Sequence, residues 1–205
     1  MRVELVSRVA LVLLTTALCV SCDVTSREPL GFDGSGSEFV GAWTSFRDRT
    51  RTYLLISKFT DHKLDIVHLE RSDHSSEGGF SMIRLIGLPV QLGEETFVSL
   101  LPQSVNGQQA VDASYLIAKC SVSSNLLHMM FMDIQKVRPL VENGSINGKI
   151  SSESGRARVL LEATSDQLAK MVRVHSASLF NVSEAHVFSR MENQTDKQVS
   201  EKCSQ

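Results

Sequence analysis

Residues 115–132 read YLIAKCSVSSNLLHMMFM and have the pattern of a β-hairpin. Two runs of apolar and β-favouring residues, 115–121 and 126–132, flank the turn-forming triplet Ser123-Ser124-Asn125. The second run is the most apolar segment after residue 22, which is typical of a strand buried on both faces. Methionine side chains also adapt to variable shapes, so Met130 and Met132 are candidate contacts to a small apolar ligand.

Similar strand signals recur on both sides of this hairpin, bounded by glycine and polar turn residues. They lie at residues 39–43, 52–58, 63–70, 80–86, 96–101, 158–162 and 185–190. Together with the hairpin they make about nine short strands, more than a flat open sheet holds without curling. The pattern therefore predicts a mainly β domain built as an antiparallel barrel or a sandwich.

Two helices are expected among the strands. Residues 164–167 (TSDQ) have the spacing of a capping box, and apolar residues then recur at helical spacing as far as Leu179. A second candidate starts at Asp133 as N-cap and stops at Asn143-Gly144, which favour a helix end. Pro139 lies within it, so we expect this helix to be short or kinked.

The order of these elements resembles a family of uncharacterised bacterial lipoproteins whose fold is similar to the lipocalin or calycin barrel. The motif Gly41-Ala42-Trp43 carries the resemblance most specifically, followed by the block from 165 to 190. It implies a lipocalin-like antiparallel barrel of eight or nine strands, with a short kinked helix and a second, amphipathic one. It also implies that Trp43 closes one end of the barrel; direct contact of Trp43 with a ligand is the alternative. The resemblance brings no catalytic residues.

The first 22 residues have the pattern of an export signal. Arg2 and Arg8 precede an uncharged run at 9–20, which as a helix is about 18 Å long and too short to span about 30 Å of hydrocarbon. The run ends in Cys19-Val20-Ser21-Cys22, which resembles a bacterial lipobox with cleavage after Ser21 and lipid on Cys22. Because Cys19 replaces the usual leucine, ordinary signal-peptidase cleavage and an uncleaved N-terminus stay open.

This organisation divides the chain into four parts. They are a signal peptide at 1–21, the lipidated cysteine with a flexible tether at 22–37, the barrel domain at 38–190, and a disordered tail at 191–205. We expect a membrane-anchored protein of the bacterial cell envelope, with the choice of inner or outer membrane left open. Cys120 is expected to be a buried free thiol, a bridge to Cys203 being the alternative.

Motifs for catalysis are absent from the sequence. It has no Gly-x-Ser-x-Gly elbow in a strand-to-helix context, no Walker loop and no dinucleotide fingerprint, so we expect neither an enzyme nor a cofactor. The formal charge of −2 gives no basic footprint for nucleic acid.

One polar cluster deserves comparison with a metal site. Its members are His62, His68, Glu70, Asp73 and His74. Imidazole and carboxylate are common metal ligands, but the spacing fits no known site, so we expect solvated surface and no metal. His128 and His186 are expected at the edges of the core.

Two function classes follow from these observations. A module that binds a small apolar ligand predicts a barrel with an apolar cavity of some hundreds of Å³. A structural lipoprotein, or one that binds an envelope protein partner, predicts a filled barrel and an exposed apolar patch.

Overall fold

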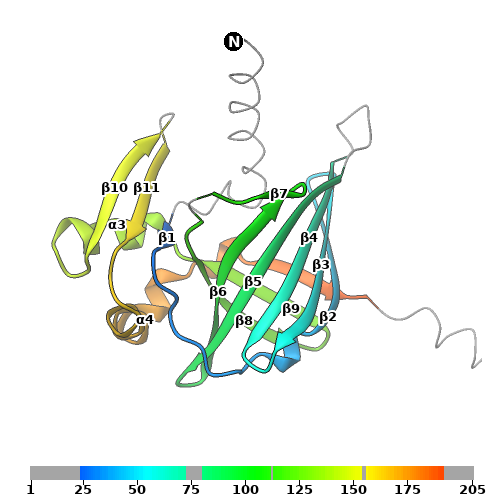
Figure 1. Cartoon of the computed structure of the whole chain (residues 1–205). Helices are drawn as coiled ribbons and strands as arrows, with labels where there is room; N and C mark the ends of the chain where they lie inside the picture. The colour runs from blue at the N-terminus through cyan, green and yellow to red at the C-terminus, as the bar shows by residue number, and fades with distance from the viewer. Residues whose placement is uncertain (1–23, 73–79, 112, 154–155, 192–205) are drawn as a thin grey trace, which may run out of the picture.

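The computed structural model describes residues 24–72, 80–111, 113–153 and 156–191, and eight of its strands close into an antiparallel barrel (Figure 1). The barrel strands are β2 (Gly41–Arg47), β3 (Thr50–Thr60), β4 (Lys63–Ser72), β5 (Phe80–Leu92), β6 (Glu95–Val105), β8 (Leu116–Ser123), β9 (Leu126–Phe131) and β12 (His186–Arg190). Each strand pairs with the next of the eight along the chain, and β12 returns to pair with β2. The prediction of a mainly β fold with an antiparallel barrel is therefore confirmed.

The ninth predicted strand lies outside the barrel. It is β11 (Arg156–Leu161), which forms a three-stranded sheet with β10 (Gly148–Glu153) and the parallel β1 (Val24–Ser26). A further short strand, β7 (Gln108–Gln109), pairs only with the end of β6. The barrel thus has eight strands, and the small sheet lies to one side of it (Figure 1).

Both predicted helices are present and begin at the predicted caps. In α4 (Ser165–Leu179), the Thr164 hydroxyl and the Gln167 side chain form a complete capping box. This pairing satisfies backbone N–H groups that the first helical turn leaves without partners.

The shorter helix, α3 (Ile134–Glu142), has Asp133 as its N-cap, with the carboxylate accepting from the Gln135 N–H at 2.8 Å. Its C-cap is Asn143, and Gly144 follows with a φ of 74°. The helix is short and stops at Asn143-Gly144, both as predicted, and it includes Pro139.

The segment before the barrel differs from the expected flexible tether. Beyond β1, Leu30 is buried at 2% exposure and its N–H donates to the Ser99 hydroxyl of β6 at 2.9 Å. The Asp33 carboxylate accepts from the Gln91 N–H of β5 at 2.9 Å. Residues 24–37 therefore lie against the lateral sheet and the outside of the barrel, because the buried Val24 and Leu30 and the paired backbone groups outweigh a polar, glycine-rich composition.

The molecule has two apolar cores that share one wall. The first fills the closed part of the barrel; the second lies between the outer face of the barrel and the small sheet with its helices. Cys120 belongs to the first core as a buried free thiol, and burial raises its pKa; Cys203 lies outside the described residues. No helix among the described residues has the length and hydrophobicity needed to cross a bilayer.

Candidate functional site in the barrel

One end of the barrel is filled by Trp43 and Arg190. Trp43 is fully buried, and its indole N–H donates to the Phe39 carbonyl at 2.8 Å. The Arg190 guanidinium lies 4.2 Å from the indole ring centroid and donates to the carbonyls of Val40 and Glu38, both at 3.1 Å. Arginine stacked on an aromatic face and bonded to two carbonyls holds the start of β2 against the end of β12.

This arrangement explains the glycine of the Gly-x-Trp motif. Gly41 has a φ of 146°, and a Cβ added there would lie 2.8 Å from Nη1 of Arg190. Glycine is required because the guanidinium approaches the backbone closely and the conformation disfavours other residues. Nothing in the local sequence around Arg190 signals this role.

The rest of the barrel encloses a cavity of about 670 Å³. Its apolar lining consists of Phe46, Leu54, Ile56, Ile66, Leu85, Leu100, Met129, Phe131, Ala185, Val187 and Phe188. The cavity extends to the turn between β2 and β3, where Arg47 and the exposed Asp48 form its rim. It therefore has one end blocked by the Trp43–Arg190 cluster and one end at the surface.

The register of the strands orders the lining by polarity. Ile56 of β3 pairs with Ile66 of β4, and the next inward pair toward the rim is Leu54 with His68. The pair after that is Thr52 with Glu70. Since alternate residues of a strand face the same side, this wall changes from apolar to polar as it approaches the rim.

His68 corrects the prediction of solvated surface. Its side chain lines the cavity and is only 3% exposed, and its Nδ1 atom has no hydrogen-bond partner among the described residues. Burial, together with the neighbouring His186, lowers the pKa of His68 to about 4. The imidazole is therefore neutral at physiological pH.

Two further titratable groups share the cavity. Glu70 is half-buried, and burial raises the pKa of its carboxyl group. His186 packs edge-on against Phe131 with ring centroids 5.7 Å apart, and burial lowers its pKa, with Arg47 acting in the same direction and Glu184 opposing. The polar part of the lining thus contains histidines that favour their neutral form.

Of the remaining members of the predicted polar cluster, the one that the structure describes, His62, does not line the cavity. His62 is exposed in the turn after β3, 6.3 Å from Phe32 between ring centroids, and Asp73 and His74 lie outside the described residues. Within the described part of the chain, no group of three or more His, Cys, Asp or Glu residues could hold a metal ion.

The three candidate ligand contacts predicted from the sequence, Trp43, Met130 and Met132, do not line the cavity. Met130 and Met132 belong to the second core, on the outer face of the barrel, while the alternate residues Met129 and Phe131 line the cavity. Trp43 belongs to the first core beneath it. Ser21 and Cys22, the predicted cleavage and lipidation residues, lie outside the described residues.

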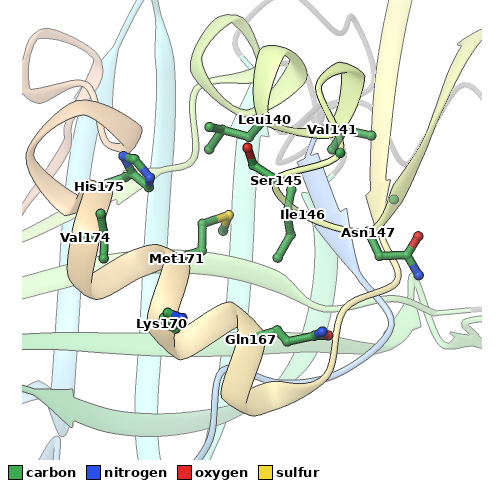
Figure 2. Close-up of a pocket in the computed structure, with 12 residues that line it drawn as sticks. Leu140, Val141, Ser145, Ile146, Asn147, Gln167, Lys170, Met171, Val174 and His175 are labelled. Carbon is green, nitrogen blue, oxygen red and sulfur yellow. The ribbon is translucent and has the colours of Figure 1, made fainter.

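A second hollow lies between the two helices (Figure 2). It has a volume of about 610 Å³, with Leu140 and Val141 of α3 on one side and Met171 and Val174 of α4 on the other. Lys170 and His175 are at its polar margin. Val174 is 67% exposed, so this hollow is a groove in the surface rather than an enclosed chamber.

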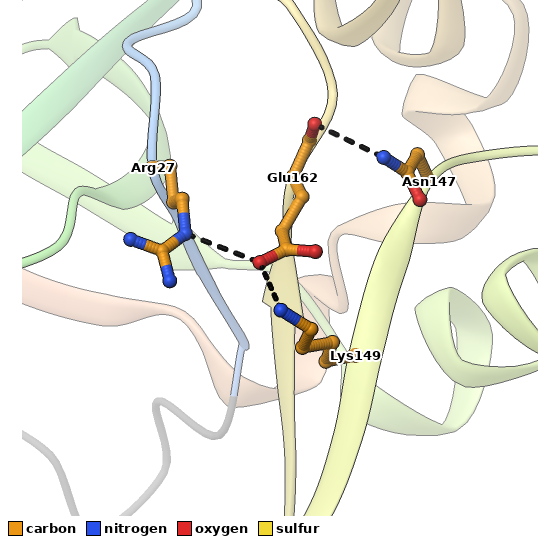
Figure 3. A network of polar contacts seen from close by, with 4 residues as sticks. All are labelled: Arg27, Asn147, Lys149 and Glu162. Atoms are coloured by element: carbon orange, nitrogen blue, oxygen red, sulfur yellow. Dashed lines mark hydrogen bonds and ion pairs between the residues drawn. The ribbon is translucent and has the colours of Figure 1, made fainter.

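Glu162 ties the N-terminal segment to the small sheet (Figure 3). Its carboxylate accepts from Lys149 Nζ at 2.7 Å and from Arg27 Nε at 3.2 Å, and its backbone carbonyl accepts from the Asn147 side chain at 3.4 Å. The Lys149 hydrogen bond is the main cause that lowers the pKa of Glu162.

The fold defines a class: a closed, eight-stranded antiparallel β-barrel with a lateral sheet and two helices, consistent with a lipocalin-like fold. No family model matches the chain, and no curated protein or solved structure matches it either.

Proposed function

We propose that this protein is a lipid-anchored protein of the bacterial cell envelope that binds a small apolar ligand inside its barrel and has no catalytic activity. The cavity of about 670 Å³ is the observation that carries the proposal. Small-molecule sites have volumes of about 300 to 1,000 Å³ and combine apolar walls with polar groups, and this cavity has that size and an apolar part that gives way to a polar rim. The envelope location and the lipid on Cys22 rest on the lipobox-like sequence at residues 19–22.

The binding activity is tested on a chain of residues 22–205 carrying Cys22→Ala, which contains every described residue. The uncharged fluorescent probe N-phenyl-1-naphthylamine should bind it with one saturable site. Ile66→Phe adds bulk to the cavity lining and should weaken probe binding about tenfold or more. Val111→Phe adds comparable bulk at an 80% exposed position and should leave binding unchanged. Absence of saturable binding in the parent chain would refute the proposed ligand site.

The anchor is tested separately by intact mass. The full-length protein extracted from bacterial membranes should carry the mass of a diacylglyceryl and an acyl group after loss of residues 1–21. The Cys22→Ala variant should lack that mass. A wild-type chain without lipid would refute the anchor and leave the ligand site untouched.

A second candidate function is an interaction lipoprotein, favoured by apolar side chains on the outside of the barrel. Leu55, Phe80 and Met82 of β3 and β5 are 39–57% exposed. Exposed apolar patches on a folded domain commonly mark contact surfaces. Failure of probe binding in the first experiment would make this the better interpretation.

A further inference from the structure

The inward face of β4 places one imidazole at the boundary between the apolar and polar parts of the cavity. His68 pairs with Leu54 on one side and with Ile83 on the other. Ile66 precedes it on the inward face and Glu70 follows it. A ligand that fills the apolar part of the cavity therefore ends beside the His68 ring.

The Nδ1 atom of His68 is buried and unpaired among the described residues. Buried polar atoms in folded proteins nearly always have a hydrogen-bond partner, so such an atom in a side chain that lines the cavity calls for an explanation. A neutral imidazole nitrogen either donates or accepts one hydrogen bond, and a hydroxyl group can serve both arrangements. The chemistry of this atom therefore fits a ligand hydroxyl.

The charges around His68 disfavour an anionic ligand group. The titratable and charged side chains that share the cavity with it are Glu70, His186, Arg47 and Asp48. Glu70 is the next inward residue on the same strand, and Arg47 at the rim is already paired with Asp48 at 3.5 Å. A carboxylate at the depth of His68 would meet a neutral ring and a second carboxylate, at a cost in desolvation that nothing nearby offsets.

We propose that His68 anchors the hydroxyl group of an uncharged amphiphile, such as a long-chain alcohol or a hydroxylated lipid fragment, whose hydrocarbon part occupies the apolar end of the cavity. This inference rests on the proposed function and adds the chemical class of the ligand. It makes His68 the residue that determines specificity, whereas the apolar lining provides affinity for hydrocarbon in general.

The test compares three eight-carbon competitors of the probe N-phenyl-1-naphthylamine at pH 7.5: 1-octanol, 1-fluorooctane and octanoate. Fluorine is close to a hydroxyl in size but is a poor hydrogen-bonding group. The parent chain should bind 1-octanol about three- to tenfold more tightly than either other competitor, the range expected for one buried hydrogen bond. In His68→Phe the three affinities should differ by less than twofold while the probe itself still binds.

The control variant is His128→Phe, a substitution of the same type at a half-buried position on the outer face of β9. It should keep the preference for 1-octanol. An equal preference in His68→Phe and in the parent chain, or a preference for octanoate, would overturn the inference while leaving the ligand site standing. Loss of all probe binding in the parent chain would instead refute the proposed function.

A measurement on the parent chain covers the case in which His68→Phe does not fold, which circular dichroism reveals. The ¹⁵N resonance of His68 Nδ1 should move when 1-octanol is added and stay in place with 1-fluorooctane. Equal shifts with both competitors would overturn the inference.

Discussion

Arg190 connects the last barrel strand to the first through three contacts of its guanidinium group. Its guanidinium stacks on Trp43 and donates to the carbonyls of Glu38 and Val40. Arg190→Met keeps the length of the side chain but removes the charge and the donors, and should lower the free energy of unfolding by about 1 to 3 kcal/mol. Arg173→Met, at an exposed position of α4, should change it by less than about 0.5 kcal/mol in the same urea titration. Equal effects of the two substitutions would contradict this role for Arg190.

His68 makes the stability of the barrel depend on pH. Burial lowers the pKa of His68 from its ordinary value of 6.5 to about 4 in the folded protein, so the folded state resists protonation. The neutral His68 leaves the free energy of unfolding unchanged above about pH 6.5. As the pH falls through 6.5 to 4, the unfolded state binds a proton more readily than the folded state, and the free energy of unfolding decreases by roughly 3 kcal/mol in total. Urea titrations at pH 7.5 and 4.5 should show a larger loss for the wild type than for His68→Phe. Losses of the same size would show that His68 is not the group responsible, because both proteins share the other titrating side chains.

Sequence reasoning finds Trp43 and misses His68 and Arg190 for different physical reasons. Trp43 belongs to a local motif in which Gly41 and Trp43 are two residues apart. His68 lies among polar neighbours, which favour a surface position, yet the alternation of Leu64, Ile66 and His68 places the three on one face of a strand. Arg190 acquires its role only through contact with residues about 150 positions away, which no local pattern encodes.

At the scale of elements, the N-terminal segment shows how little apolar surface is needed to order a chain against an existing fold. Leu30 is 2% exposed, while Phe32, two residues later, is 58% exposed. Leu30→Ala should therefore lower the free energy of unfolding by about 2 to 4 kcal/mol, and Phe32→Ala by less than about 0.5 kcal/mol. Urea titration of both variants measures the difference. If Leu30→Ala lowers the free energy of unfolding no more than Phe32→Ala does, residues 24–37 behave as the flexible tether that their composition predicts.

Helices and strands are predicted correctly where neighbouring residues determine them, and less well where distant residues do. The caps of α3 and α4 depend on residues within one turn, and both are confirmed. β10 was missed because its one large apolar residue, Ile150, is 37% exposed, so the strand has no buried alternation to recognise. β11 was recognised as a strand, but its assignment to the lateral sheet depends on partners that lie far away in the sequence.

At the scale of the whole molecule, the barrel wall joins the two cores. Leu116 and Ala118 of β8 belong to the first core, whereas Ile117 between them belongs to the second. On β6, the Glu95 carboxylate accepts from the Ser176 hydroxyl of α4 and is paired with Lys119 of β8. The lateral sheet and its helices are thus one structural unit with the barrel.

A shared wall predicts a single cooperative unfolding transition, since neither core can lose its packing without exposing the strands that form the other. Trp43 is the one tryptophan of the chain and reports on the first core by fluorescence. Leu168, fully buried in the second core, provides the perturbation. Leu168→Ala should lower the stability measured at Trp43 by about 2 to 5 kcal/mol, although the two residues belong to different cores.

Far-ultraviolet circular dichroism follows the helices in the same urea titration and should give the same midpoint as Trp43 fluorescence, in the wild type and in Leu168→Ala. Ala177→Ser, at an exposed position of the same helix, controls for effects of substitution in α4 as such and should leave both midpoints near the wild-type value. Separate midpoints, or a Trp43 transition that Leu168→Ala does not move, would mean that the lateral sheet and helices unfold independently. The barrel would then have to hold its cavity open without support from the second core, and substitutions there could not alter ligand binding.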